Sequence, residues 1–247
     1  MVYDHFAKVY DELMENVPYD QWLNWFEEGL QKYHSTTPRI LEVGCGTGTL
    51  LKMLLKHGYD VDGVDISNEM LAIATTKIRP LSSEPLLMQQ DMRSLNIGKT
   101  YDVVIVFCDS LNYLTEKEDI RRAFRSFWRH LNNGGLLFFD VHSVHYVEEI
   151  LHGFSFAEDR EHVAYIWNIF PTTRKGEVLQ ELTLFFEREP SFYERFFEVH
   201  QQRTFSIDTY QELLHLEHFD TLGTYADFTW LPPKPHSERL FFVAKKL

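Results

Sequence analysis

The chain has 247 residues, of which 44% are hydrophobic and 25% are charged, as in an ordinary globular protein. Its formal net charge of −13 argues against a general nucleic-acid-binding surface, because phosphate contacts require clustered lysine and arginine side chains. Apolar runs such as VVIVF are far shorter than the roughly 18 residues that span a bilayer, and the acidic start MVYDHFAKVYDELM is unlike a signal peptide. We therefore expect a cytoplasmic protein with a small-molecule substrate, no nucleic-acid partner and no membrane partner.

The first 150 residues alternate between helix and strand patterns. Phe6, Val9, Tyr10 and Leu13 have helical spacing and predict a short helix before Pro18. Further helices are expected over 22–33, 46–57 and 68–78. Another is expected to begin at the capping-box pattern Thr115-x-x-Glu118 and to end before the glycines at 134–135. Strands are expected over 40–44, 61–65, 86–91, 101–107 and 136–141. This alternation predicts a mostly parallel sheet with helices on both faces.

The pattern changes after residue 150. Residues 151–204 contain four strand-like segments rich in aromatic and β-branched residues, which predict an inserted antiparallel β lobe. A helix over 207–218 and two strands, HFDTLGTYADF and RLFFVAKKL, follow it. We therefore predict an α/β fold with a Rossmann-like seven-stranded sheet. Its domain comprises residues 1–150 and 205–247, and the lobe either covers a substrate pocket or pairs two subunits in a homodimer.

The stretch ILEVGCGTGTL, residues 40 to 50, predicts a ligand close to the backbone. Gly44, Gly46 and Gly48 alternate with other residues directly after a strand. The dinucleotide fingerprint is G-x-G-x-x-G, so the spacing here departs from it by one residue. Asp65 ends the second strand, where its carboxylate can accept hydrogen bonds from two ribose hydroxyls or can cap the next helix. Asp91 ends the third strand, where it can accept a hydrogen bond from an adenine amine or remain a solvated loop residue.

These motifs together resemble one enzyme family. The segments EVGCGTG, VDGVDIS and QQDM, which contain Glu42, Asp65 and Asp91, resemble the class I S-adenosylmethionine-dependent methyltransferases over roughly residues 38 to 143. FAKVYDEL, FCDSLNYL and FDVHS further resemble a bacterial small-molecule subgroup with a β-rich insertion, akin to the amino-sugar N-methyltransferases. The resemblance implies that S-adenosyl-L-methionine is the cofactor.

The resemblance also implies roles for particular residues. The three glycines would lie under the methionine part of the cofactor, and Asp65 would hold the ribose. Phe107 or Cys108 would approach the methionine amino group through a backbone carbonyl. The complete set of cofactor-binding residues expected on this basis is Tyr10, Glu42, Gly44, Gly46, Gly48, Asp65, Ile66, Asp91, Met92, Phe107 and Cys108. Packing within its own helix is the alternative role for Tyr10.

Methyl transfer from a sulfonium is an in-line displacement that depends mainly on proximity and alignment. A general base is needed only where the acceptor arrives protonated. Asp109, after the fourth strand, and His142, after the fifth, are the catalytic candidates, and Arg203 is a candidate contact for an anionic acceptor. No metal-ligand motif is present, so no metal is expected.

Four interpretations of the function remain open. The first is methyl transfer to a nitrogen or oxygen of a small molecule. The second is a nicotinamide-dependent oxidoreductase, which the glycine spacing and Glu42 disfavour. The third is a cofactor-binding protein without catalytic activity, and the fourth is a methyltransferase acting on RNA or protein. The acidic net charge and the lack of an N-P-P-Y-type motif after the fourth strand weigh against RNA.

Overall fold

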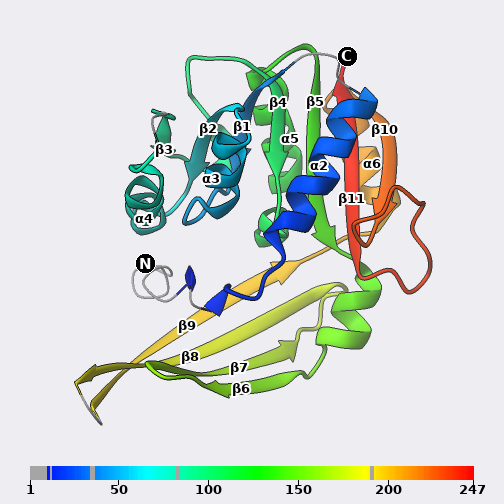
Figure 1. The fold of residues 1–247 in the computed structure, drawn as a ribbon. Coiled ribbons are helices and arrows are strands. Elements are labelled where there is room, and N and C mark those ends of the chain that lie inside the picture. The colour runs from blue at the N-terminus through cyan, green and yellow to red at the C-terminus, as the bar shows by residue number, and fades with distance from the viewer. Residues whose placement is uncertain (1–9, 12, 34–36, 82–83, 190–191) are drawn as a thin grey trace.

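The computed structural model describes all residues except 1–9, 12, 34–36, 82–83 and 190–191. Its main sheet is mixed and has seven strands (Figure 1). The strands are β1 (Arg39–Val43), β2 (Asp60–Asp65), β3 (Leu87–Gln89), β4 (Tyr101–Val106), β5 (Leu131–His142), β10 (Phe219–Ala226) and β11 (Arg239–Lys246). Their order is β10-β11-β5-β4-β1-β2-β3, with β11 antiparallel to both of its neighbours and the other pairs parallel. The predicted fold class is confirmed.

Helices cover both faces of this sheet. The helices are α2 (Tyr19–Tyr33), α3 (Thr49–Lys56), α4 (Asn68–Ile78), α5 (Lys117–His130) and α6 (Ile207–Leu216). On one face, Phe124 of α5 and Tyr210 of α6 pack around Phe139, with ring centroids 5.4 and 5.9 Å from it. On the other face, Trp25 of α2 packs edge-on against Phe138. The alternating side chains of the buried strands thus supply two apolar cores, one for each layer of helices.

A second, antiparallel sheet of four strands lies below the carboxyl ends of the main strands in Figure 1. It consists of β6 (Ser155–Asp159), β7 (Val163–Pro171), β8 (Glu177–Glu189) and β9 (Phe192–Arg203), and we call it the lobe. Leu13, from the N-terminal segment, packs against Val163 and Leu184 on the inner face of the lobe. All four strands fall within the predicted insertion, whose domain boundaries remain a prediction.

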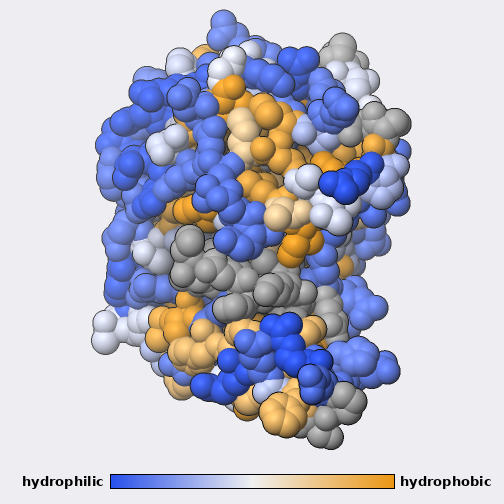
Figure 2. Space-filling model, turned by 90° about the vertical axis from the view of Figure 1, so that its left-hand side faces the viewer, coloured by the Kyte–Doolittle hydropathy of each residue, from blue (hydrophilic) through white to orange (hydrophobic). Residues whose placement is uncertain are grey.

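The outer face of the lobe exposes apolar side chains. Ile166, Phe170 and Phe197 are 40%, 44% and 49% exposed, and strand alternation places them opposite the inner face. Figure 2 shows hydrophobic side chains on the lobe, near the bottom of the view, and in a strip higher up. The predicted homodimer remains a prediction, and this outer face is an apolar surface that a second subunit could cover.

Three predicted boundaries differ from the structure because of local backbone geometry. The helix expected from Gly46 begins at Thr49, since Gly46 and Gly48 adopt positive φ angles that no helix accepts. The capping box is wrong, because the residue before α5 is Glu116 and no side chain caps this helix end. The glycines at 134–135 lie within β5, which starts at Leu131 rather than at residue 136. The helix expected over residues 6–13 falls largely outside the described residues.

Candidate active site

Three short helical turns complete the edge of the sheet where the candidate residues gather. They are η1 (Met92–Ser94), η2 (Ser110–Tyr113) and η3 (Tyr146–Leu151). Because the parallel strands β1, β2, β3, β4 and β5 run the same way, the segments that follow them meet at one edge.

The loop after β1 contains the three glycines in a backbone conformation that favours glycine. Gly44, Gly46 and Gly48 have φ angles of +73°, +53° and +73°, in the left-handed region. A Cβ on Gly44 would lie 2.8 Å from the Ser110 hydroxyl oxygen. A Cβ on Gly46 would meet no atom of the described residues within 4 Å. Gly46 therefore faces open space, where a ligand can approach the backbone directly.

Asp65 joins the end of β2 to this glycine loop. Its Oδ2 accepts a hydrogen bond from the Gly46 N–H at 2.8 Å, and its Oδ1 accepts one from the Ser67 N–H at 2.9 Å. Burial raises the pKa of Asp65, and the backbone donors partly oppose that rise. Each carboxylate oxygen retains a second lone pair for a ligand hydroxyl. The neighbouring Ile66 is 54% exposed, so it offers an apolar surface beside the carboxylate.

Glu42 of β1 is a buried carboxyl group with an unsatisfied oxygen. Its side chain is 4% exposed, and its Oε2 has no hydrogen-bond partner within the described part of the chain. Burial raises the pKa of Glu42 to about 8, and the charge of Asp65 adds to the rise. A buried polar atom without a partner is costly. The ammonium group of a bound amino acid would supply a partner, which fits a ligand with a methionine moiety.

Asp91 and Met92 follow β3, and the Asp91 carboxylate is bound by Arg93. Arg93 Nε lies 3.0 Å from both carboxylate oxygens, and the Arg93 backbone N–H donates to Oδ1 at 2.9 Å. These hydrogen bonds lower the pKa of Asp91. The Met92 side chain packs against the core. Contact of these two residues with an adenine ring remains a prediction, and Arg93 already uses part of the capacity of Asp91 to accept hydrogen bonds.

Phe107, Cys108 and Asp109 form the turn after β4. Cys108 and Asp109 have φ angles of +56° and +50°, which are strained for residues other than glycine. The Phe107 side chain is buried, and its carbonyl oxygen accepts a hydrogen bond from the Ser110 hydroxyl at 2.8 Å. Burial raises the pKa of the Cys108 thiol well above its ordinary value, so the thiol is neutral and a weak nucleophile. Phe107 and Cys108 can therefore serve a ligand through their backbone rather than through reactive side chains.

Tyr10 and Tyr19 form a pair of partly buried tyrosines. Tyr10 hydrogen-bonds to the Tyr19 side chain. Burial raises the pKa of both Tyr10 and Tyr19 above the ordinary phenol value. Both groups therefore remain neutral hydroxyls at physiological pH. The predicted contact of Tyr10 with the cofactor remains a prediction.

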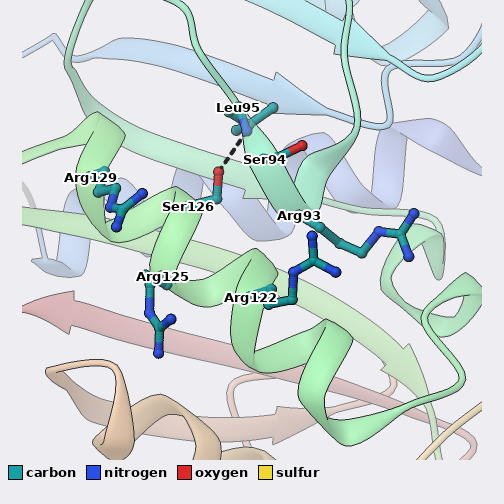
Figure 3. A pocket seen from close by; sticks show the side chains of 7 residues that line it. All are labelled: Arg93, Ser94, Leu95, Arg122, Arg125, Ser126 and Arg129. Atoms are coloured by element: carbon teal, nitrogen blue, oxygen red, sulfur yellow. Dashed lines mark hydrogen bonds between the residues drawn. The ribbon is translucent and has the colours of Figure 1, made fainter.

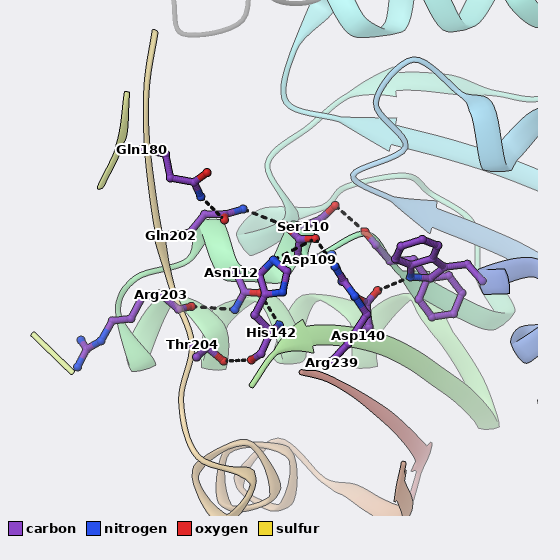
Figure 4. Close-up of polar contacts among 12 residues, drawn as sticks. Asp109, Ser110, Asn112, Asp140, His142, Gln180, Gln202, Arg203, Thr204 and Arg239 are labelled. Carbon is purple, nitrogen blue, oxygen red and sulfur yellow. Dashed lines mark hydrogen bonds and ion pairs between the residues drawn. The ribbon is translucent and has the colours of Figure 1, made fainter. Parts of the chain in front are cut away.

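A buried ion cluster joins Asp109 to Asp140 through Arg239 of β11 (Figure 4). Arg239 donates to Asp109 Oδ1 at 3.1 Å and also to Asp140 Oδ2, and Trp22 Nε1 donates to Asp140 Oδ1 at 3.0 Å. Burial acts to raise the pKa of Asp109, but His142 and Arg239 outweigh it and the pKa is lowered. Burial dominates at Asp140, whose pKa is raised. Asp109 is therefore a firmly held anion and a poor proton acceptor.

His142 and Gln202 also contact the Asp109 carboxylate. His142 Nε2 lies 3.5 Å from Asp109 Oδ1, and Gln202 Nε2 donates to Asp109 Oδ2 at 3.0 Å. The His142 ring packs on Tyr146, with centroids 4.8 Å apart. Gln180 of β8 donates to Gln202 Oε1 at 2.6 Å. The structure thus brings the two catalytic candidates together and joins them to the lobe through Gln202.

Reasoning from the sequence missed a second polar group on the inner face of the lobe. His200 Nε2 lies 3.3 Å from Glu198 Oε2, and both side chains are 7% exposed. His200 Nδ1 lies 3.4 Å from the Tyr113 hydroxyl. Glu198, His200 and Gln202 alternate along β9, and alternate residues of a strand lie on one of its faces. This alternation is the sequence signal that could have identified the group.

Arg203 and the arginine side chains beside α5 make their contacts with groups other than Asp109. Arg203 donates to the backbone oxygens of Lys175 and Thr115 at 3.2 Å and points away from Asp109 in Figure 4, so its predicted contact with an acceptor is not supported. A hollow of about 340 Å³ beside α5 is also basic (Figure 3). It is lined by Arg93, Ser94, Leu95, Arg122, Arg125, Ser126 and Arg129. Its guanidinium groups are largely paired with acids, such as Arg125 with Glu217, so we assign no ligand to it.

Comparisons with known proteins support the interpretation of the glycine loop. The family model described as a methyltransferase domain matches residues 40–135. "Putative methyltransferase YqeM" of Bacillus subtilis (strain 168) is 42% identical over 248 residues, covering 100% of this chain and 98% of that protein. The crystal structure of an S-adenosylmethionine-dependent methyltransferase from Clostridium acetobutylicum ATCC 824 has a TM-score of 0.88 at 27% identity, covering 99% of this chain and 98% of that one.

A more distant relative has a named acceptor. The dTDP-3-amino-3,4,6-trideoxy-alpha-D-glucopyranose N,N-dimethyltransferase of Streptomyces venezuelae is 34% identical over 106 residues, which covers 42% of this chain and 43% of that protein. The cofactor is thus S-adenosylmethionine rather than a dinucleotide, and its contact with the glycine loop remains a prediction. On these matches and on the geometry of the loop, the chain belongs to the S-adenosylmethionine-dependent methyltransferases.

Proposed function

We propose that the protein methylates the nitrogen of a small-molecule amine. When bound, S-adenosylmethionine supplies an electrophilic methyl group for in-line displacement. In this proposal Asp65 accepts hydrogen bonds from the ribose, Ile66 contacts the adenine, and Glu42 accepts one from the amino group. The other cofactor contacts come from Tyr10, Gly44, Gly46, Gly48, Asp91, Met92, Phe107 and Cys108.

The observation that carries the choice of an amine is the charge around the end of β4. Asp140 and Glu198 are buried acids there, and Asp109 is a half-buried one. Arg239 is the cation bound among them. An acidic, poorly hydrated site favours a cationic acceptor over an anionic one. These negative charges stabilise a positively charged ammonium group, whereas they stabilise a neutral hydroxyl group less.

The lobe supports a small acceptor rather than a polymer. Its inner face contacts the site directly, through Gln202 to Asp109 and through His200 to Tyr113. A lobe in this position favours a small acceptor that is enclosed between the lobe and the main sheet and shielded from water. The amino-sugar relative provides a precedent for an amine on a small molecule. RNA or protein methylation and a purely cofactor-binding role have no comparable observation in their favour.

We assign the proton transfer to His142, with Asp109 beside it. An amine that arrives as an ammonium must lose a proton before its lone pair can attack. His142 accepts that proton in this proposal, and Asp109, as a permanent anion 3.5 Å away, stabilises the resulting imidazolium. Asp109 contributes charge rather than proton transfer, because its pKa is lowered.

The test of the proposed function is a screen with methyl-labelled S-adenosylmethionine. Each amine in the panel, including nucleotide-linked amino sugars, is paired with the analogue that carries a hydroxyl in place of the amine. We expect label to enter at least one amine and not its hydroxyl partner. Transfer to hydroxyl compounds alone, or to RNA or protein alone, would contradict the proposal.

Replacing His142 with asparagine should lower kcat for the amine found in that screen about 100-fold at neutral pH, the usual effect of losing a general base. Raising the pH should restore part of the rate, because more of the acceptor is then already deprotonated. The control is His152→Asn, an exposed histidine, which should leave kcat unchanged. A His142→Asn enzyme within threefold of wild type at neutral pH would remove His142 from the proton transfer.

Binding of S-adenosylhomocysteine should release about one proton at pH 7. Glu42 has a pKa of about 8 without ligand and is then mostly protonated, and an adjacent ammonium group favours the ionised form. Affinity should therefore rise between pH 6 and pH 8. Calorimetry in buffers of different ionisation enthalpy measures the release. Glu42→Gln should abolish most of it, and equal release by the variant and the wild type would refute the role of Glu42.

A further inference from the structure

A row of hydrogen bonds crosses the lobe and ends at Asp109. Trp167 Nε1 donates to Gln180 Oε1 at 3.0 Å, and Gln180 Nε2 donates to Gln202 Oε1 at 2.6 Å. Gln202 Nε2 donates to Asp109 Oδ2 at 3.0 Å, and the last two of these bonds are drawn in Figure 4. The three donors come from β7, β8 and β9, in that order. We call Trp167, Gln180 and Gln202 the relay.

The two ends of the relay fix the orientation of both glutamine amides. An indole N–H can only donate a hydrogen bond, and an ionised carboxylate can only accept one. If the Gln202 amide were reversed, its oxygen would face the Asp109 carboxylate. If the Gln180 amide were reversed, its NH2 group would face the Trp167 N–H. Only one arrangement therefore satisfies every member of the relay.

Burial makes the reversed arrangements costly. Gln180 and Gln202 are each 6% exposed. A buried amide that loses its partner costs about 1–3 kcal/mol, because water cannot replace the lost hydrogen bond. Consecutive hydrogen bonds in such a chain also strengthen one another. The relay thus presents the Gln202 N–H to Asp109 Oδ2 from a fixed direction.

Asp109 has competing partners on its other carboxylate oxygen. Asp109 Oδ1 lies 3.1 Å from Arg239 Nη2 and 3.5 Å from His142 Nε2. A guanidinium group often binds both oxygens of one carboxylate. Gln202 binds Oδ2 and therefore opposes a rotation that would turn both oxygens toward Arg239 and away from His142.

The chain directly after Gln202 binds the other catalytic candidate. The Arg203 carbonyl oxygen accepts a hydrogen bond from Asn112 Nδ2 at 2.9 Å, and Asn112 Oδ1 accepts one from the His142 N–H at 3.0 Å. The Thr204 hydroxyl donates to the His142 carbonyl oxygen at 2.6 Å (Figure 4). One short stretch of chain, residues 202–204, therefore contacts both the Asp109 carboxylate and the groups that hold the His142 backbone.

We propose that the relay holds the Asp109 carboxylate toward His142 and thereby sets kcat for methyl transfer. The effect on kcat rests on the proposed function, in which Asp109 stabilises the protonated His142. Gln180 and Gln202 are positioning residues, since they act through Asp109 rather than on the reacting atoms. The lobe then orients the carboxylate of the site in addition to covering the acceptor.

Crystal structures of the wild type and of Gln202→Met test the positioning without any acceptor. Methionine has a similar length but no amide, so Asp109 Oδ2 loses this donor. We expect the Asp109 carboxylate of the variant to bind Arg239 through both oxygens and to leave hydrogen-bond range of His142. An Asp109 carboxylate that keeps its wild-type orientation would overturn the relay, whatever the acceptor is.

Kinetics with the amine found in the screen test the consequence for catalysis. Gln202→Met should lower kcat about tenfold, as expected from losing one hydrogen bond to a charged group, and should leave KM for S-adenosylmethionine unchanged. Gln180→Met should lower kcat less, because Gln202 keeps its own bond to Asp109. Gln201→Met changes the exposed neighbour in β9 and is the matched control, which should alter neither constant.

A double-mutant cycle determines whether Gln202 acts through Asp109. In an Asp109→Asn background, Gln202→Met should change kcat less than about twofold, because the charge that it positions is already absent. An undiminished loss of kcat in that background would show that Gln202 supports the fold in general, and would contradict the relay. A screen in which no amine is methylated would refute the proposed function and the effect on kcat, whereas the crystal structures would still decide whether the relay orients Asp109.

Discussion

Replacing Arg239 with methionine should lower the free energy of unfolding by about 3–5 kcal/mol, the range measured when one partner of a buried ion pair is removed. Asp140 is fully buried, and Arg239 donates hydrogen bonds to it and to Asp109. Methionine fills a similar space but leaves both carboxyl groups without their shared cation. Denaturation with urea at pH 7 measures the loss.

Two further variants make the Arg239 result interpretable. Arg239→Lys keeps the charge but cannot form two divergent hydrogen bonds, so it should lose less stability than methionine. Arg188→Met breaks an exposed ion pair with Glu194 and should cost less than about 1 kcal/mol. A methionine variant at Arg239 that unfolds like the Arg188 control would show that the buried cluster does not stabilise the fold.

Replacing Asp65 with alanine should weaken the binding of S-adenosylhomocysteine at least about 100-fold. Two charge-assisted hydrogen bonds to ribose hydroxyls are lost, and each contributes about 1.5–3 kcal/mol. The Gly46 and Ser67 N–H groups also lose their acceptor, so the glycine loop becomes less well defined. Isothermal titration calorimetry measures the change.

The matched control is Asp60→Ala, at the opposite end of β2. Asp60 bonds to Arg39 on the surface and lies away from the carboxyl edge of the sheet. Its removal should change the affinity less than twofold. Equal losses in the two variants would mean that Asp65 acts through the stability of β2 and not through the ribose.

Elements that depend on a local pattern could be predicted from the sequence. The period-2 and helical patterns identified both sheets and the helices between the strands, since burial of one face determines which residues must be apolar. The three glycines and Asp65 were found because they follow consecutive strands of a parallel sheet. The start of α3 was not found, because the positive φ angles of Gly46 and Gly48 interrupt a helix that the apolar spacing alone would continue.

Contacts between distant segments gave no such local signal. Arg239 binds Asp109 across 130 positions of the chain, and nothing near either residue indicates the other. The same holds for Gln202 of the lobe. Asp91 is predicted as an adenine contact or a solvated loop residue, and nothing in that pattern indicates that Arg93, two residues later, binds its carboxylate. Whether a carboxylate in an irregular turn binds a neighbouring side chain or a ligand depends on the direction of its side chain. That direction follows from the folded backbone and not from the sequence pattern.

The most direct test of the account is a crystal structure of the protein with S-adenosylhomocysteine. We predict that the ligand lies along the backbone of Gly44, Gly46 and Gly48, with its ribose hydroxyls on Asp65 and its amino group near Glu42. A ligand bound elsewhere, or bound with its ribose away from Asp65, would contradict the cofactor site from which the remaining proposals follow.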